Sequence, residues 1–192
     1  MMTCIRTPLA AAALAIALAI PLAVPLHAQG QPAVPAPAVA ALSTAERAEL
    51  VRQAQAAIAS IDDIDALMRL LPPEIFKIFE RSAFEQLSRA AMTQLKAAGF
   101  RIVKAEFDEP TTPYRAGRAI ICFAPYTLLM QIKGRLFRSR TYFLAVRSID
   151  GGEWKFVDGA GLEKHREWLW TMFPELPRDI RFPEWRQEEI KS

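Results

Sequence analysis

The sequence predicts an α+β domain in which N-terminal helices pack on a curved, four-stranded antiparallel meander that is followed by a C-terminal helix. Apolar residues recur at helical spacing between residues 43 and 98. Between residues 103 and 158, short apolar or alternating runs are separated by turn residues, which is typical of consecutive antiparallel strands. A helical pattern returns at residues 162–173. Helices that precede a block of strands indicate the α+β class, and we expect them to cover one face of the sheet.

The first 28 residues have the pattern of a secretory signal peptide. Arg6 is their only charged residue, an unbroken apolar run from Leu9 to Ile20 follows it, and Ala28 lies at the expected cleavage site. An uncleaved membrane anchor is the alternative interpretation. Pro21 and Pro25 disfavour it, because a membrane-spanning helix needs about 20 consecutive apolar residues. We therefore expect a periplasmic or secreted protein with no transmembrane span after cleavage.

A Pro/Ala-rich linker at residues 29–42 should separate this leader from a single domain at residues 43–192. Removing 28 of the 192 residues leaves 164, which is enough for one hydrophobic core. The whole chain has 24 basic and 21 acidic side chains, so net charge favours no class of partner, and export disfavours nucleic acid. Cys122 and His165 are single within the domain, so an internal disulfide and a Cys/His zinc site are excluded. We expect no cofactor and no metal.

Capping residues mark the expected helix boundaries. Ser, Thr, Asp and Asn satisfy free amides at a helix start, while proline and glycine end helices. The residues that set these boundaries are the capping boxes Ser43–Glu46 and Ser82–Glu85, the pair Asp62 and Asp63, the pair Pro72 and Pro73, and Gly99.

Strands are expected at residues 103–107, 119–133, 141–148 and 154–158. Pro125 should bend or interrupt the second strand, because proline cannot donate to a ladder. Lys133 and Gly134 should form the turn to the third strand. A single helix from Leu162 to Phe173 should follow, with an extended tail after Pro174.

The stretch SIDGGEWKFVD at residues 148–158 is similar to the Asp-box repeat of sialidase-like propellers. Ser148, Asp150, Gly152 and Trp154 match that repeat, but its threonine is missing and the spacing is one residue short. A propeller also needs several copies of its repeat and a longer chain. We therefore expect an ordinary hairpin, in which the glycines supply positive φ angles.

The order of elements resembles the cone-shaped fold of nuclear transport factor 2-like and ketosteroid isomerase-like proteins between residues 43 and 158. A cystatin-like sheet wrapped on one helix fits almost as well. In ketosteroid isomerase-like sites an Asp base and a Tyr donor face a closed apolar pocket. The resemblance implies that such a ligand-binding pocket would be lined by Tyr126, Tyr142, Trp154 and Asp158. The alternative is that these aromatic residues belong to the core and that Asp158 is a turn or helix-start residue.

A basic segment, KGRLFRSR, surrounds the expected turn at residues 133–140. Its cations Lys133, Arg135, Arg138 and Arg140 are candidates for binding an anionic lipid or glycan surface. The alternative is a solvated hairpin tip, whose charges prevent strands of different molecules from pairing.

Three functions remain open. The leading hypothesis is an exported, non-catalytic domain that binds a ligand or an envelope protein. The others are a small-molecule enzyme with a cone-fold pocket and an envelope-surface module that uses the basic hairpin. No catalytic residue is assigned, since Cys122 lies in an apolar run and is expected to be a buried, unreactive thiol. An apolar cavity that ends in Asp and Tyr would favour the enzyme.

Overall fold

The computed structural model describes residues 41–190, so the predicted signal peptide and nearly all of the predicted linker lie outside it. The helices are α1 (Thr44–Ala59), α2 (Ile64–Leu70), the 3-10 helix η1 (Pro73–Lys77), α3 (Arg81–Ala97), α4 (Gly159–Lys164) and α5 (Glu167–Met172). The strands are β1 (Arg101–Phe107), β2 (Tyr114–Ala116), β3 (Ala119–Ile132), β4 (Arg135–Ser148), β5 (Lys155–Asp158) and β6 (Arg186–Ile190). The predicted α+β class is confirmed.

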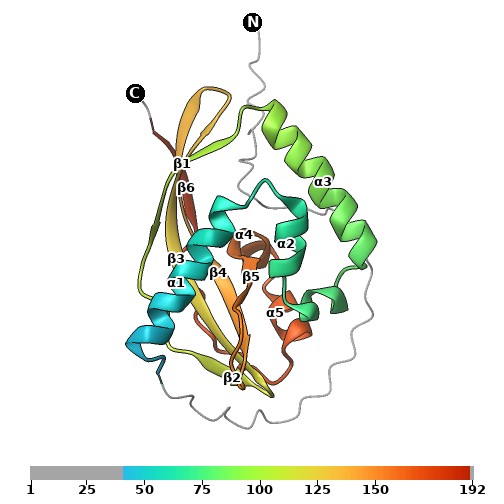
Figure 1. Ribbon diagram of the computed structural model, residues 1–192, viewed down its shortest axis with the longest axis vertical. Helices are drawn as coiled ribbons and strands as arrows, with labels where there is room; N and C mark the ends of the chain where they lie inside the picture. Colours follow the sequence, from blue (N-terminus) through green and yellow to red (C-terminus); the bar gives the residue numbers. More distant parts are fainter. Residues whose placement is uncertain (1–40, 191–192) are drawn as a thin grey trace, which may run out of the picture.

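The sheet is built on two long central strands, β3 and β4, which curve through the molecule (Figure 1). The outer edge of β3 is shared by β1 and β2, and the outer edge of β4 is shared by β5 and β6. All pairs are antiparallel, and the β3–β4 turn has positive φ at Lys133 and Gly134, as expected. The sheet has six strands instead of four.

Neither additional strand has an alternating apolar run long enough to predict it, because β2 has three residues and β6 is mostly polar. β2 forms because Gly117 adopts φ +56° and turns the chain back onto β3 within three residues. β6 is RQEEI, a polar edge strand, and lies in the tail that was expected to be merely extended. It pairs with Leu136–Arg140 of β4, where its acids face the arginines of that strand.

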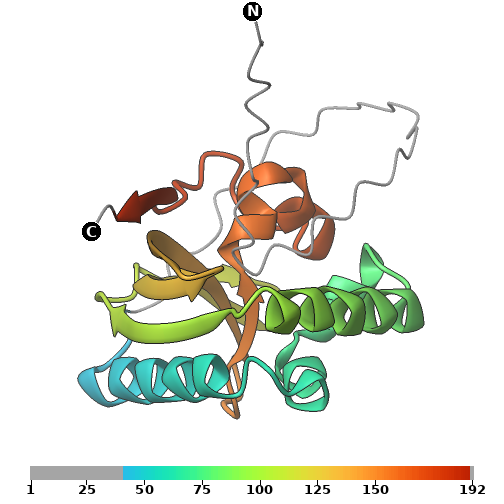
Figure 2. The same cartoon turned by 90° about the horizontal axis from the view of Figure 1, so that it is seen from above.

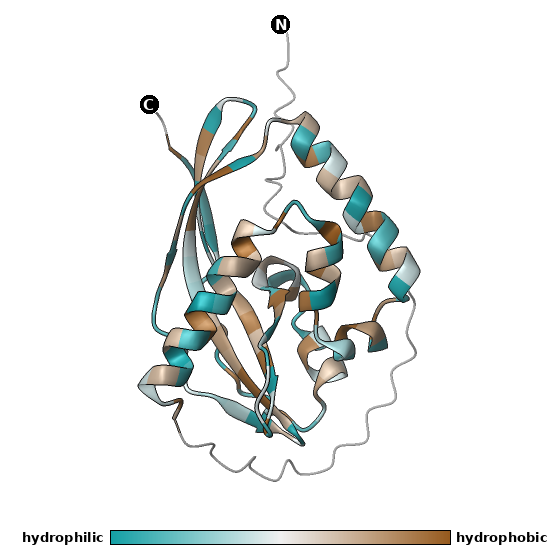
Figure 3. Cartoon of the chain, in the orientation of Figure 1, coloured by the Kyte–Doolittle hydropathy of each residue, from teal (hydrophilic) through white to brown (hydrophobic). Residues whose placement is uncertain are grey.

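Helices cover both faces of the sheet, not one as predicted. Figure 2 shows α1 and α2 on one side of the strands and α4 and α5 on the other. Alternation along β4 divides the core accordingly, because Phe143 and Ala145 pack with α1 while Tyr142 and Leu144 pack with α5 and the segment after it. Figure 3 shows hydrophobic residues concentrated on the central strands and α2, with hydrophilic residues on the outer sides of α1 and α3.

The predicted start of α3 is wrong by two residues. The expected capping box at Ser82 and Glu85 does not form, because Glu80 takes the N-cap and its carboxylate accepts from the amides of Ser82 at 3.0 Å and Ala83 at 2.7 Å. The capping box at Ser43 and the cap of α2 by Asp63 are confirmed.

Pro125 does not interrupt β3. Its carbonyl faces the β1 side, where it accepts from the amide of Asp108 at 2.9 Å, just beyond the last β1 pair. In an antiparallel strand the nitrogen of a residue points to the same side as its carbonyl, so the missing donor of Pro125 faces the β1 side. The pairing of β3 with β4 therefore continues through Pro125 and Tyr142. β1 is irregular at Val103, which bulges outward and is 47 % exposed.

The predicted C-terminal helix is divided into α4 and α5. His165 has φ −135° and ψ 62° and ends α4, and Arg166 opens the next helix. The break allows the His165 ring to stack on Trp168 with the ring centres 4.1 Å apart. The second helix thereby places Trp168 against Phe79 of the N-terminal half, whereas Trp170 packs against the segment after α5.

The segment that resembles an Asp-box is the β4–β5 hairpin. Gly151 and Gly152 have φ of +94° and +104°, and the Ser148 hydroxyl accepts from the amide of Asp150 at 3.2 Å. Trp154 is fully buried, and its amide donates to Gln53 of α1 at 2.8 Å. The prediction of an ordinary hairpin is confirmed, and turn geometry accounts for the similarity.

Candidate functional site

An apolar pocket lies at the free edge of β5, between the two helical layers. Phe156 and Val157 are consecutive on β5 and point to opposite faces of the sheet, yet both line the pocket, which places it around the strand edge. Its volume is about 90 Å³. The remaining lining residues are Ala57, Ile61, Leu67, Leu70, Leu71, Ile75, Phe79, Phe84, Phe143, Asp158, Gly161 and Trp168.

The pocket exists because several helices meet at this edge without closing over it. α2 contributes Leu67 and Leu70, and the turn before α3 contributes Phe79. These three side chains are half-buried, so they form an apolar mouth that opens toward solvent. Trp168 of α5 closes the opposite wall and packs edge-on against Phe79 at 4.9 Å.

Among residues 41–190, Asp158 is the only charged residue that lines this pocket. It ends β5 and caps α4, with its Oδ1 accepting from the amide of Ala160 at 2.7 Å. Its Oδ2 accepts from the hydroxyl of Tyr126 at 3.2 Å. Within residues 41–190, Asp158 has no Lys, Arg or His ion-pair partner. Burial raises the pKa of Asp158 to about 6, although both hydrogen bonds act in the opposite direction.

Tyr126 reaches Asp158 from the centre of β3. It is fully enclosed between Phe107 and Phe143, whose ring centres lie 5.2 Å and 4.8 Å from its own. Burial is the main cause that raises the pKa of Tyr126 well above its usual value, and the neighbouring Asp158 adds to it. The phenol therefore stays protonated and serves as a fixed donor to the carboxylate.

Of the four predicted ligand residues, only Asp158 lines the pocket, and Tyr126 contacts it from behind through its hydrogen bond to Asp158. The other two, Tyr142 and Trp154, lie elsewhere. Tyr142 points to the opposite face of the sheet, against Phe123 and Phe182, and burial raises the pKa of its phenol. Trp154 lies in the α1-side core under the guanidinium of Arg147, which is 4.7 Å from the ring centre. Strand alternation separates Tyr142 from Tyr126, and spacing alone did not reveal which of them faces Asp158.

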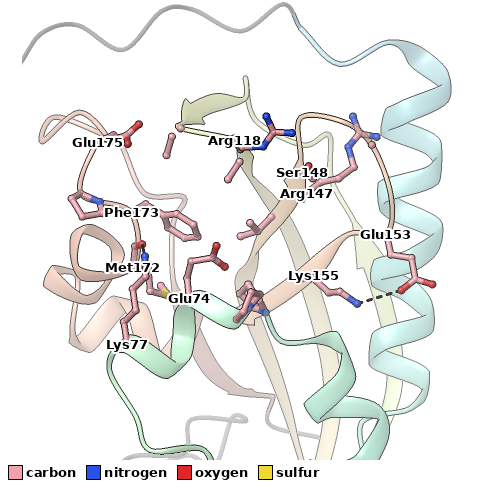
Figure 4. A pocket seen from close by; sticks show the side chains of 18 residues that line it. Glu74, Lys77, Arg118, Arg147, Ser148, Glu153, Lys155, Met172, Phe173 and Glu175 are labelled. Carbon is pink, nitrogen blue, oxygen red and sulfur yellow. Dashed lines mark hydrogen bonds and ion pairs between the residues drawn. The ribbon is translucent and has the colours of Figure 1, made fainter.

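A second, wider pocket of about 550 Å³ is lined by residues with both signs of charge. Figure 4 shows side chains entering it from η1, from the β4–β5 hairpin and from residues 172–175. Its cations are already engaged, since Lys155 pairs with Glu153 at 3.3 Å, Arg147 pairs with Glu46 at 2.6 Å and Lys77 donates to the carbonyl of Met172 at 2.8 Å. Arg118 pairs with Asp150. Among the lining cations within residues 41–190, only Lys77 has no carboxylate partner, and its ammonium group already donates to a backbone carbonyl.

The basic hairpin is largely neutralised by acids that are distant in sequence. Arg135 pairs with Glu189 at 3.1 Å, Arg138 with Glu188 at 3.5 Å, and Arg140 with Asp108 at 3.2 Å. Two of these acids belong to β6, which the sequence did not predict as a strand. A site for an anionic surface would have to displace these pairs.

Replacing Lys133, Arg135, Arg138 and Arg140 together by glutamine is expected to change the free energy of unfolding by less than about 2 kcal/mol, because exposed ion pairs contribute little. The variant and the parent should bind vesicles containing phosphatidylglycerol equally at low salt. Salt-sensitive binding by the parent that disappears in the variant would revive the envelope hypothesis.

Cys122 is buried, as expected, and burial raises the pKa of its thiol to about 12, which disfavours the reactive thiolate. Residues 41–190 contain no group of three or more His, Cys, Asp or Glu side chains placed to hold a metal ion. In the same range, no helix is both long enough and apolar enough to cross a membrane.

Comparisons of the chain with protein-family models, with curated proteins and with solved structures found no match.

Proposed function

We propose that this chain is an exported domain that binds a small, mostly apolar ligand in the β5-edge pocket, with Asp158 as the polar anchor. The observation that carries the proposal is an ionisable carboxyl in an apolar pocket, with no balancing cation within residues 41–190. Asparagine caps a helix about as well as aspartate, so the fold does not require the charge. A group that is unfavourable for folding and faces a pocket is typical of a binding site.

The form of the pocket limits the ligand. A volume of about 90 Å³ accommodates a branched alkyl group or a small ring, and the half-buried mouth allows a longer ligand to extend outward. Asp158 is partly accessible and supplies acceptor oxygens. The ligand therefore needs an apolar body and one hydrogen-bond donor.

Catalysis at the same pocket is a second candidate function. A carboxyl with a pKa of about 6 is suited to general base chemistry near neutral pH. The pairing of Asp158 with Tyr126 supports this candidate, since the ketosteroid isomerase-like resemblance implies an Asp and a Tyr at the pocket. However, the Tyr126 hydroxyl donates to Asp158 itself, so it is not directed at a substrate oxygen. Binding without catalysis therefore remains the primary proposal.

Export and the relationship to the cone-fold proteins are part of the same proposal. The pattern of residues 1–28 supports a cleaved leader. The succession of N-terminal helices and a long curved sheet supports an architecture similar to the nuclear transport factor 2-like fold. The helices on the second face, α4 and α5, depart from the predicted arrangement.

Isobutanol is a suitable probe for the pocket because it combines a branched alkyl group with one hydroxyl donor. We expect millimolar binding, which is typical for so few heavy atoms. In methyl-resolved carbon–proton NMR spectra, titration should shift the signals of Ile61, Leu67 and Leu70 but not that of Leu128, which lies away from the pocket.

Two variants of α1 provide a matched comparison. Ala57→Phe places a ring at a lining position and should abolish the shifts, whereas Ala56→Phe is on the exposed side of the same helix and should leave them intact. Shifts spread over the whole surface, or binding that survives in Ala57→Phe, would contradict the proposed site.

A further inference from the structure

The charge of the β5-edge pocket is unbalanced. In the part of the chain that the structure describes, Asp158 is the single ionisable side chain that lines it, and no Lys, Arg or His does so. Ionised carboxylates inside proteins are normally paired with a cation, because desolvation without a partner is unfavourable. The positive partner of this carboxylate is thus missing from residues 41–190, and a ligand can supply it.

The pocket wall is also unusually aromatic. Five rings line it, contributed by five different segments: Phe79, Phe84, Phe143, Phe156 and Trp168. Phe143 and Phe156 pack against each other at 5.3 Å, and Phe79 contacts both Phe84 and Trp168. Aromatic rings around a cavity attract organic cations through the negative faces of their π systems.

Asp158 keeps acceptor capacity for a further donor. Its two oxygens each accept one hydrogen bond from the protein, from Ala160 and from Tyr126. An ionised carboxylate offers about four acceptor sites. An alcohol that donates to this carboxylate brings no charge of its own, whereas an ammonium donor adds direct attraction between opposite charges, which is strong in an apolar pocket.

We infer that the ligand of the β5-edge pocket is an organic amine that binds as an ammonium ion, with its charged nitrogen at Asp158 and its short apolar body among the aromatic rings. The inference rests on the proposed function, since it specifies the ligand class for the same pocket. It does not require covalent chemistry or a metal.

Isobutylamine and isobutanol test the ammonium assignment because they share one carbon skeleton and differ in charge at about pH 7.5. We expect isobutylamine to bind the full domain about tenfold more tightly than isobutanol in NMR titrations of the pocket methyl groups. In Asp158→Asn the two probes should bind equally, and in Ala57→Phe neither should bind.

The outcomes separate this inference from the proposed function. Equal affinity of the two probes in the parent, or a preference for isobutylamine that persists in Asp158→Asn, would overturn the ammonium assignment while leaving the pocket as a binding site. Failure of both probes to shift the pocket methyl groups would overturn the inference and the proposed function together. Because Asp158→Asn is expected to fold stably, loss of the preference in that variant reports on charge.

Discussion

Gly159→Ala is expected to destabilise the domain by about 3 kcal/mol. A Cβ at this position would lie 2.5 Å from the carbonyl oxygen of Tyr142 and 2.6 Å from two carbons of its ring. The oxygen belongs to the backbone of the central strand β4, so it cannot move aside without distorting the sheet. The substitution should therefore push α4 off the sheet and displace Asp158, which is adjacent to it. Urea denaturation measures the loss.

Gly161→Ala is the matched control on the same short helix. The nearest atom to a Cβ there is a ring carbon of Trp168 at 4.0 Å, which is ordinary van der Waals contact. Alanine also favours helix over glycine by up to about 1 kcal/mol. This variant should be as stable as the parent or slightly more so. Equal losses at both positions would show that α4 is not held by the close contact at Gly159.

Asp158→Asn is expected to raise the free energy of unfolding by about 3 kcal/mol at about pH 8. The folded protein holds the pKa of Asp158 at about 6, above the usual 3.8, so the native state binds the proton more tightly than the unfolded state. Such a group penalises folding as pH rises from about 4 to 6, and the penalty is complete above that range. The asparagine variant has no such penalty, because its side chain does not ionise. Its gain in the free energy of unfolding over the parent should therefore vanish near pH 3.

The titratable groups that face Asp158 are phenols. Tyr126 contacts it from β3, and the charge of Asp158 also acts on Tyr142 of β4. Burial keeps both phenols protonated across this range, because it raises the pKa of each. The change in stability between about pH 4 and 6 is therefore assigned to the carboxyl of Asp158.

Asp63→Asn is a control in which the pH-dependent change in stability is expected to have the opposite sign. Asp63 caps α2 through the amide of Ala66 at 3.0 Å, and this hydrogen bond lowers the pKa of Asp63. Its charge therefore stabilises the fold at neutral pH and loses that effect in acid. Thermal unfolding across pH should show opposite slopes for the two variants relative to the parent. A loss of stability at pH 8 in Asp158→Asn would contradict the account of an unbalanced carboxyl.

Local signals predicted most helix and turn positions. Ser43, Asp63 and Gly99 mark helix ends through hydrogen bonds and backbone angles that involve only a few neighbouring residues. The prediction of where α3 starts was wrong because two possible caps, Glu80 and Ser82, lie two residues apart. The carboxylate of Glu80 accepts from two of the free amides at the helix start, so Glu80 is the N-cap. β6 was missed because its polar sequence is stabilised by pairing with β4, which is distant in sequence.

The site was predicted only in part, for a geometric reason. Asp158 and Tyr126 were both named from the sequence, and the structure joins them. The prediction that Tyr142 lines the pocket was wrong because side chains alternate between the two faces of a sheet, so a shift of one position along a strand moves a residue to the other face. The aromatic wall was not predicted, since Phe79 comes from a turn and Phe84 and Trp168 from two helices, and the meeting of these segments at the β5 edge depends on tertiary packing.

The pKa of Asp158 in the ligand-free domain tests the central claim most directly. Carboxyl carbon-13 NMR, assigned by comparison with Asp158→Asn, reports the protonation of this side chain as pH is varied. The account predicts a midpoint of about 6, because the carboxyl is enclosed by an apolar pocket without a balancing cation. A midpoint near 3.8 would contradict it, since the carboxyl would then be solvated or paired and would not need a ligand to balance its charge.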